Sequence, residues 1–133
     1  MKKLFITTIA AWALTALPAT SVADEAPAFM QDTFPETAVD GAWQEFQAIH
    51  DPDGALDART KELIALGIAA QVPCDYCIYY HTNAAESLGA SEAQIREALA
   101  VAASVRKWST VLNGSLYDFS EWQQQVDEMF AQD

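Results

Sequence analysis

Two cysteines, Cys74 and Cys77, stand three positions apart directly after Pro73, a residue that often opens a helix. The first N–H groups of a helix lack intrahelical acceptors and its dipole is positive at that end, so a thiol placed there ionises more readily. The thiolate is the form that attacks peroxides and disulfides. His81 follows Cys77 by four residues and therefore shares its helix face. The spacing predicts a redox-active cysteine pair with a base beside it.

Three other interpretations of these residues remain open. A structural disulfide here would close a four-residue loop, which stabilises a fold by only about 2 kcal/mol. A zinc site would find a third ligand in His81, but the only other histidine is His50, in a turn 24 residues before Cys74. His81 could also be a core histidine on an apolar stripe. We favour the redox pair, and we expect neither a metal nor a cofactor.

Glu62 stands at the head of an apolar run, residues 63–70, that contains no other polar side chain. One interpretation is an acid in the first turn of a helix, where it interacts favourably with the dipole. The other is a carboxylate held in apolar surroundings and suited to proton transfer. The spacing alone leaves both open.

Helices are predicted along the whole chain after an extended leader over residues 24–35, and no segment alternates like a strand. Helices are expected to start at Asp57 and at Ser91, which forms a capping box with Gln94. A helix is expected to end at Gly89, and a turn is expected at Asn113–Gly114. Ser120 is expected to cap the last helix. The prediction is an all-α fold of five or six helices in a single domain. The expected helices cover residues 36–49, 57–71, 74–88, 91–107 and 120–129.

The N-terminal residues 1–23 have the layout of a secretory signal peptide. Lys2 and Lys3 precede an apolar run from Leu4 to Leu17, and Ser21-Val22-Ala23 supplies small residues before a cut at Asp24. An uncleaved anchor is the alternative, although the run is shorter than the roughly 20 residues that span a bilayer. We therefore expect an exported domain, residues 24–133, in a periplasm.

The net charge of the chain is −12, from 19 acidic and 7 basic residues, and removal of residues 1–23 leaves 110 residues with a charge of −14. Such a surface has no basic patch for nucleic acid and does not favour an anionic membrane. We expect neither partner. A chain of this length buries a modest fraction of its surface, so association with copies of itself is expected.

The pattern of Glu62, Cys74, Cys77 and His81 resembles the active site of the alkylhydroperoxidase D-like (AhpD-like) branch of the carboxymuconolactone decarboxylase family. The likeness covers about residues 54–114. It extends to the flanking residues Gly54–Ala65, Ala84-Ala85, Gly89-Ala90-Ser91, Ile95 and Glu97-Ala98.

The resemblance implies an all-α fold that assembles into trimers or hexamers, with peroxidase chemistry. It implies that Cys77 is the peroxidatic thiol and Cys74 the resolving thiol, which form a redox disulfide. His81 and Glu62 would then form the proton relay, and an external dithiol would reduce the disulfide. The chain departs from the best-known peroxidase of the family, which has a histidine where Tyr76 stands, and which has two copies of the helical unit.

Other functions stay open at this level. A thiol–disulfide exchange protein would use the same cysteine pair without turning over peroxide. A decarboxylase or lactone-acting enzyme is suggested by the family name, but such relatives do not depend on a cysteine pair. A non-enzymatic helical module with an acidic face is a further possibility.

Overall fold

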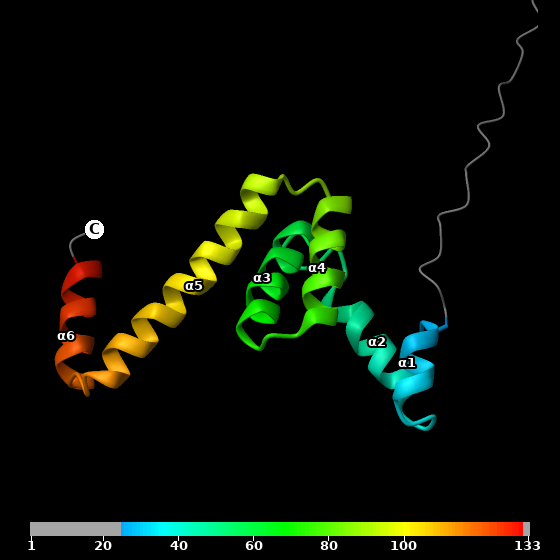
Figure 1. Cartoon of the computed structure of the whole chain (residues 1–133), viewed down its shortest axis with the longest axis horizontal. Helices are drawn as coiled ribbons and strands as arrows, with labels where there is room; N and C mark the ends of the chain where they lie inside the picture. The colour runs from blue at the N-terminus through cyan, green and yellow to red at the C-terminus, as the bar shows by residue number, and fades with distance from the viewer. Residues whose placement is uncertain (1–24, 132–133) are drawn as a thin grey trace, which may run out of the picture. The chain divides into compact units, whose positions relative to one another are not determined.

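The computed structural model describes residues 25–131, and every regular element within that range is an α-helix (Figure 1). The prediction of an all-α fold with five or six helices is therefore confirmed. The expected signal peptide, residues 1–23, lies outside the described residues. The six helices are α1 (Ala28–Thr33), α2 (Val39–Ile49), α3 (Ala58–Gln71), α4 (Asp75–Ser87), α5 (Glu92–Gly114) and α6 (Phe119–Phe130).

The chain divides into two compact units, and the boundary between Gln44 and Glu45 falls inside α2. In the first unit, helix α1 lies where an extended leader was expected, so that expectation was wrong. Pro27 precedes the helix with a φ of −57°, and its carbonyl accepts from the amides of Met30 and Gln31. A helix of six residues is too short to give a periodic sequence signal.

The second unit contains α3, which packs against α4 and α5, while α4 also contacts α5. Leu66 of α3 is fully buried. Gly67 lets α5 approach closely, because a Cβ atom at this position would lie 3.4 Å from the Cβ of Ala102. Gln71 adds a hydrogen bond between α3 and α5, because its Nε2 donates to the carbonyl of Ala102 at 2.9 Å. Helix α3 is thus held on two sides and carries Glu62 between them.

Most helix ends in this unit lie where the capping residues and Gly89 predicted them. Asp57 caps α3 by accepting from the Thr60 amide, and the capping box of Ser91 and Gln94 opens α5. Helix α4 ends before Gly89, whose φ of +82° suits glycine. These predictions are confirmed.

Two predicted boundaries near the C-terminus were wrong. Helix α5 continues past Lys107 and through the expected turn at 113–114. The side chain of Asn113 donates to the carbonyl of Ser109 one turn earlier and so stays within the helix. Helix α6 is capped by Asp118 and not by Ser120, whose hydroxyl donates to the Asp118 carboxylate.

No helix within the described residues 25–131 is long and apolar enough to cross a membrane.

Candidate functional site

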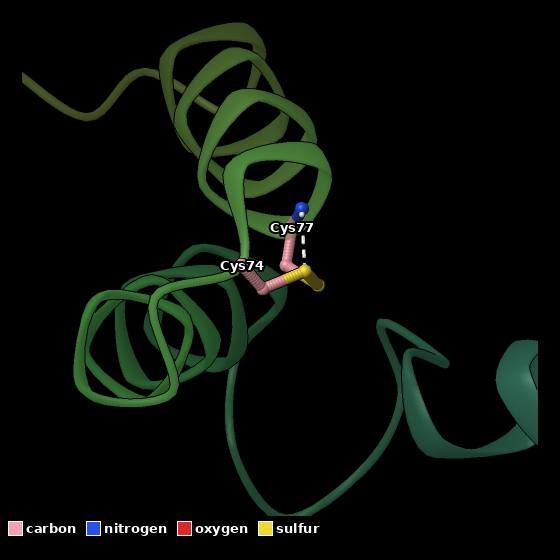
Figure 2. The surroundings of a disulfide bond; sticks show 2 residues. All are labelled: Cys74 and Cys77. Atoms are coloured by element: carbon pink, nitrogen blue, oxygen red, sulfur yellow. Dashed lines mark hydrogen bonds between the residues drawn. A yellow bond between two sulfur atoms is a disulfide. The ribbon is translucent and has the colours of Figure 1, made fainter.

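Cys74 and Cys77 form a disulfide at the start of α4, with Cα atoms 5.2 Å apart (Figure 2). Cys74 is the N-cap residue, and the Cys77 amide donates a hydrogen bond to its Sγ at 3.2 Å. Both cysteines are partly exposed. The sulfur pair therefore lies at the positive end of a helix and within reach of a reductant.

Glu62 is the one buried charged residue among those described, at 6% exposure. Its Oε2 lies 2.6 Å from Nδ1 of His81, and its Oε1 lies 2.7 Å from Nδ1 of His50. The structure thus brings Glu62 and His81 together, as the resemblance implied. The other interpretation of Glu62, as an acid in the first turn of a helix, was wrong, because α3 begins at Ala58 and has no acidic residue in its first turn.

The proton on each ring is assigned from its contact with Glu62. An ionised carboxylate only accepts hydrogen bonds, so both Nδ1 atoms donate. A neutral imidazole that donates from Nδ1 has its lone pair on Nε2. Each histidine can therefore act as a base through Nε2, while Glu62 stabilises the imidazolium that results.

Sequence reasoning missed His50, which it treated only as an unsuitable zinc ligand. Its backbone amide bonds to the carbonyl of Phe46 at the end of α2. Its ring stacks on that of Phe46, with centroids 4.3 Å apart, and lies nearly parallel to the ring of His81. The turns over residues 50–57 lead into α3, whose residue Glu62 reaches the His50 ring through its side chain. The only feature of the sequence that pointed to this contact was the position of His50 in a turn before Glu62, which begins an apolar run.

Tyr80 borders the same cluster from α4. Its ring meets His81 edge-on at a centroid distance of 5.0 Å and lies 5.9 Å from that of Phe46. Partial burial raises the pKa of the Tyr80 phenol above 10.0, and the negative charge of Glu62 raises it further. Tyr80 is therefore a neutral neighbour of Glu62 and His81 at physiological pH.

Tyr76, which stands between the cysteines, is 91% exposed and takes no place in this cluster. Within residues 25–131, no group of three or more His, Cys, Asp or Glu side chains is arranged to hold a metal ion. Both Nδ1 atoms are already engaged by Glu62. The arrangement is a buried carboxylate between two imidazoles, with the disulfide residue Cys77 one helical turn before His81.

Comparison with known proteins places residues 34–117 within the model of the "Carboxymuconolactone decarboxylase family". Two uncharacterised bacterial proteins are similar. One, from the cox locus of Paracoccus denitrificans, is 42% identical over 69 residues, which cover 52% of this chain and 62% of that protein. The other, from Cupriavidus necator, is 38% identical over 66 residues, which cover 50% of this chain and 58% of that protein.

Among solved structures, the fold resembles the alkylhydroperoxidase AhpD core of Rhodospirillum rubrum, with a TM-score of 0.61 and 26% identity. The match covers 66% of this chain and 65% of that one. The chain spans less than two thirds of the length of each of these relatives.

Proposed function

Because the chain belongs to the carboxymuconolactone decarboxylase family, we propose that it is a thiol-dependent oxidoreductase that reduces hydroperoxides with Cys74 and Cys77. The observation that carries the proposal is the hydrogen bond between the buried Glu62 and His81, one turn after Cys77. A structural disulfide would need no such base beside it.

The first half-reaction oxidises Cys77. His81 takes the thiol proton at Nε2, and Glu62 stabilises the imidazolium from the opposite side of the ring. The Cys77 thiolate attacks one oxygen of the peroxide, the O–O bond breaks, and Cys77 becomes a sulfenic acid. The imidazolium returns a proton to the departing alkoxide, which leaves as an alcohol.

The second half-reaction closes the disulfide. The Cys74 thiolate attacks the sulfur of the sulfenic acid, and hydroxide leaves as water after taking up a proton. An external dithiol then reduces the disulfide by exchange and is itself oxidised. The partial exposure of both cysteines supports access for this donor.

Thiol–disulfide exchange without peroxide turnover is the second candidate, and the hydrogen bond from the Cys77 amide to Cys74 Sγ favours it. The same donor would stabilise Cys74 as a thiolate when a reductant attacks Cys77. A better-stabilised thiolate leaves faster, so this contact assists exchange whatever the oxidant is.

Export to a periplasm and assembly into trimers or hexamers complete the proposal. The leader-like residues 1–23 support export. Apolar side chains left exposed on α3 and α5, among them Ile68 and Val101, support assembly, because a single copy leaves them in water.

A stopped-flow reaction of the reduced protein with an organic hydroperoxide tests the function. We expect disulfide formation far faster than oxidation of a free thiol, and its loss in the Cys77→Ser variant. Oxidation no faster than that of a free thiol would exclude the peroxidase and favour exchange. A screen of exported and cytoplasmic dithiol proteins, scored by opening of the disulfide, would then identify the reductant class.

A further inference from the structure

The carboxylate of Glu62 binds two imidazoles, and the mechanism above uses only one of them. Oε2 serves His81, while Oε1 lies 2.7 Å from Nδ1 of His50. The two oxygens belong to one rigid planar group, so the direction of one fixes the direction of the other. Whatever holds Oε1 therefore also aims Oε2 at His81.

The ring and the backbone of His50 are both held in place by contacts with Phe46. Its ring stacks on Phe46 with an interplanar angle of 22°, and its amide is anchored to the carbonyl of the same residue. Its side chain is 19% exposed, against 14% for His81. Its Nδ1 is consequently presented to Glu62 in a fixed orientation, from the residue that directly follows α2.

Loss of the donor at Oε1 would leave a buried carboxylate oxygen without a partner. That state is costly, and the group escapes it by rotating or by taking up a proton. Either change removes the aligned negative charge that the His81 imidazolium requires.

We propose that His50 is a positioning residue, which acts through Glu62 to hold His81 ready to take the Cys77 proton. The inference rests on the proposed thiol chemistry, but it concerns the ionisation of Cys77 and does not require a peroxide. Two other roles give different expectations. If the His50 ring were purely structural, another ring in its place would preserve the reactivity of Cys77. If the ring itself accepted protons, an amide in its place would not preserve that reactivity.

Three variants separate these roles. In His50→Asn, the amide nitrogen takes the place of Nδ1 and can still donate to Oε1. In His50→Phe, the ring remains and can stack on Phe46, but the donor is lost. In His50→Gln, the same amide is displaced by one methylene group. Asp53→Asn changes an exposed residue of the same turn and serves as the control.

The measurement is alkylation of Cys77 by iodoacetamide at pH 7 in a Cys74→Ser background, with circular dichroism to verify folding. We expect His50→Phe to slow alkylation by about tenfold or more, and His50→Asn and Asp53→Asn to stay within about threefold of the parent. If His50→Phe does not fold, the comparison of Asn with Gln decides, with only Asn expected to preserve the rate.

An unchanged rate in a folded His50→Phe protein would overturn the proposal in favour of a structural ring. Equal loss in the Asn variant and the Phe or Gln variant would also overturn it, since a donor at Oε1 would then be insufficient. Failure of the peroxidase function is a separate result, seen when the parent alkylates rapidly yet does not react with hydroperoxide.

Discussion

His81 on α4 and Glu62 on α3 are joined by a 2.6 Å contact between Nδ1 and Oε2, although 19 residues separate them in the chain. The carboxylate is buried, so the interaction is shielded from water and stronger than the same pair on a surface. The Glu62→Gln variant keeps the shape of the side chain and removes its charge. We expect it to lower the rate constant for reaction with hydroperoxide by about a hundredfold or more.

The matched control for that variant is Glu86→Gln, which removes an exposed carboxylate from α4. We expect the control to react at the parental rate. If Glu62→Gln also reacted at that rate, Glu62 would have no part in the proposed relay.

The sequence predicted those features that depend on neighbouring residues. The caps at Asp57 and Ser91 and the stop at Gly89 use side chains and backbone within one turn, so their residue types alone were sufficient. The end of α5 was misjudged because Asn113, common in turns, bonds back to Ser109 within the helix.

The sequence predicted only those residues of the candidate site that belong to the family resemblance. The resemblance named Cys74, Cys77, Glu62 and His81, and the structure shows the contact of Glu62 with His81. The contact of His50 with Glu62 joins two residues 12 positions apart across a loop, and no local periodicity carries that information.

The phenol of Tyr80 is a pH-sensitive reporter of the cluster. Its pKa is raised first by burial and second by the charge of Glu62, so the folded state holds the phenol proton more tightly than the unfolded state. The resulting stability is fully present below pH 10.0, the ordinary value, and is lost as the pH rises through the folded-state pKa. We expect absorbance at 295 nm to show a late-titrating tyrosine that disappears in Tyr80→Phe.

The Glu62→Gln variant then tests the electrostatic cause of that shift. Removal of the charge should move the pKa of Tyr80 downward, while partial burial keeps it above 10.0. An unchanged Tyr80 titration would show that burial alone raises this pKa.

Gly67 of α3 faces Ala102 of α5, and a Cβ atom at this position would just reach van der Waals contact. The Gly67→Leu variant would drive a bulky side chain against Ala102, and we expect it to lower the free energy of unfolding by about 1–3 kcal/mol. Gly67→Ala is the milder comparison, because its methyl group would meet the Cβ of Ala102 at 3.4 Å. Chemical denaturation measures both variants, and equal stability of Gly67→Leu and the parent would contradict the observed packing.

An apolar groove of about 770 Å³ between α3 and α5 is expected to be filled by a second copy of the chain. Ile64, Ile68, Val101 and Val105 line it, and all four are exposed in one copy. Helix α6 also exposes the apolar side chains of Phe119 and Phe130, and no other described helix packs on it. Size exclusion with light scattering should therefore give an oligomer at micromolar concentration.

The Val101→Glu variant should shift this equilibrium toward the monomer, because a charge buried in an apolar interface is strongly unfavourable. Ala103→Glu places the same charge on α5, at an exposed residue outside the groove, and should leave the assembly intact. A monomeric parent, or an equal effect of the two substitutions, would exclude the groove as the interface between copies.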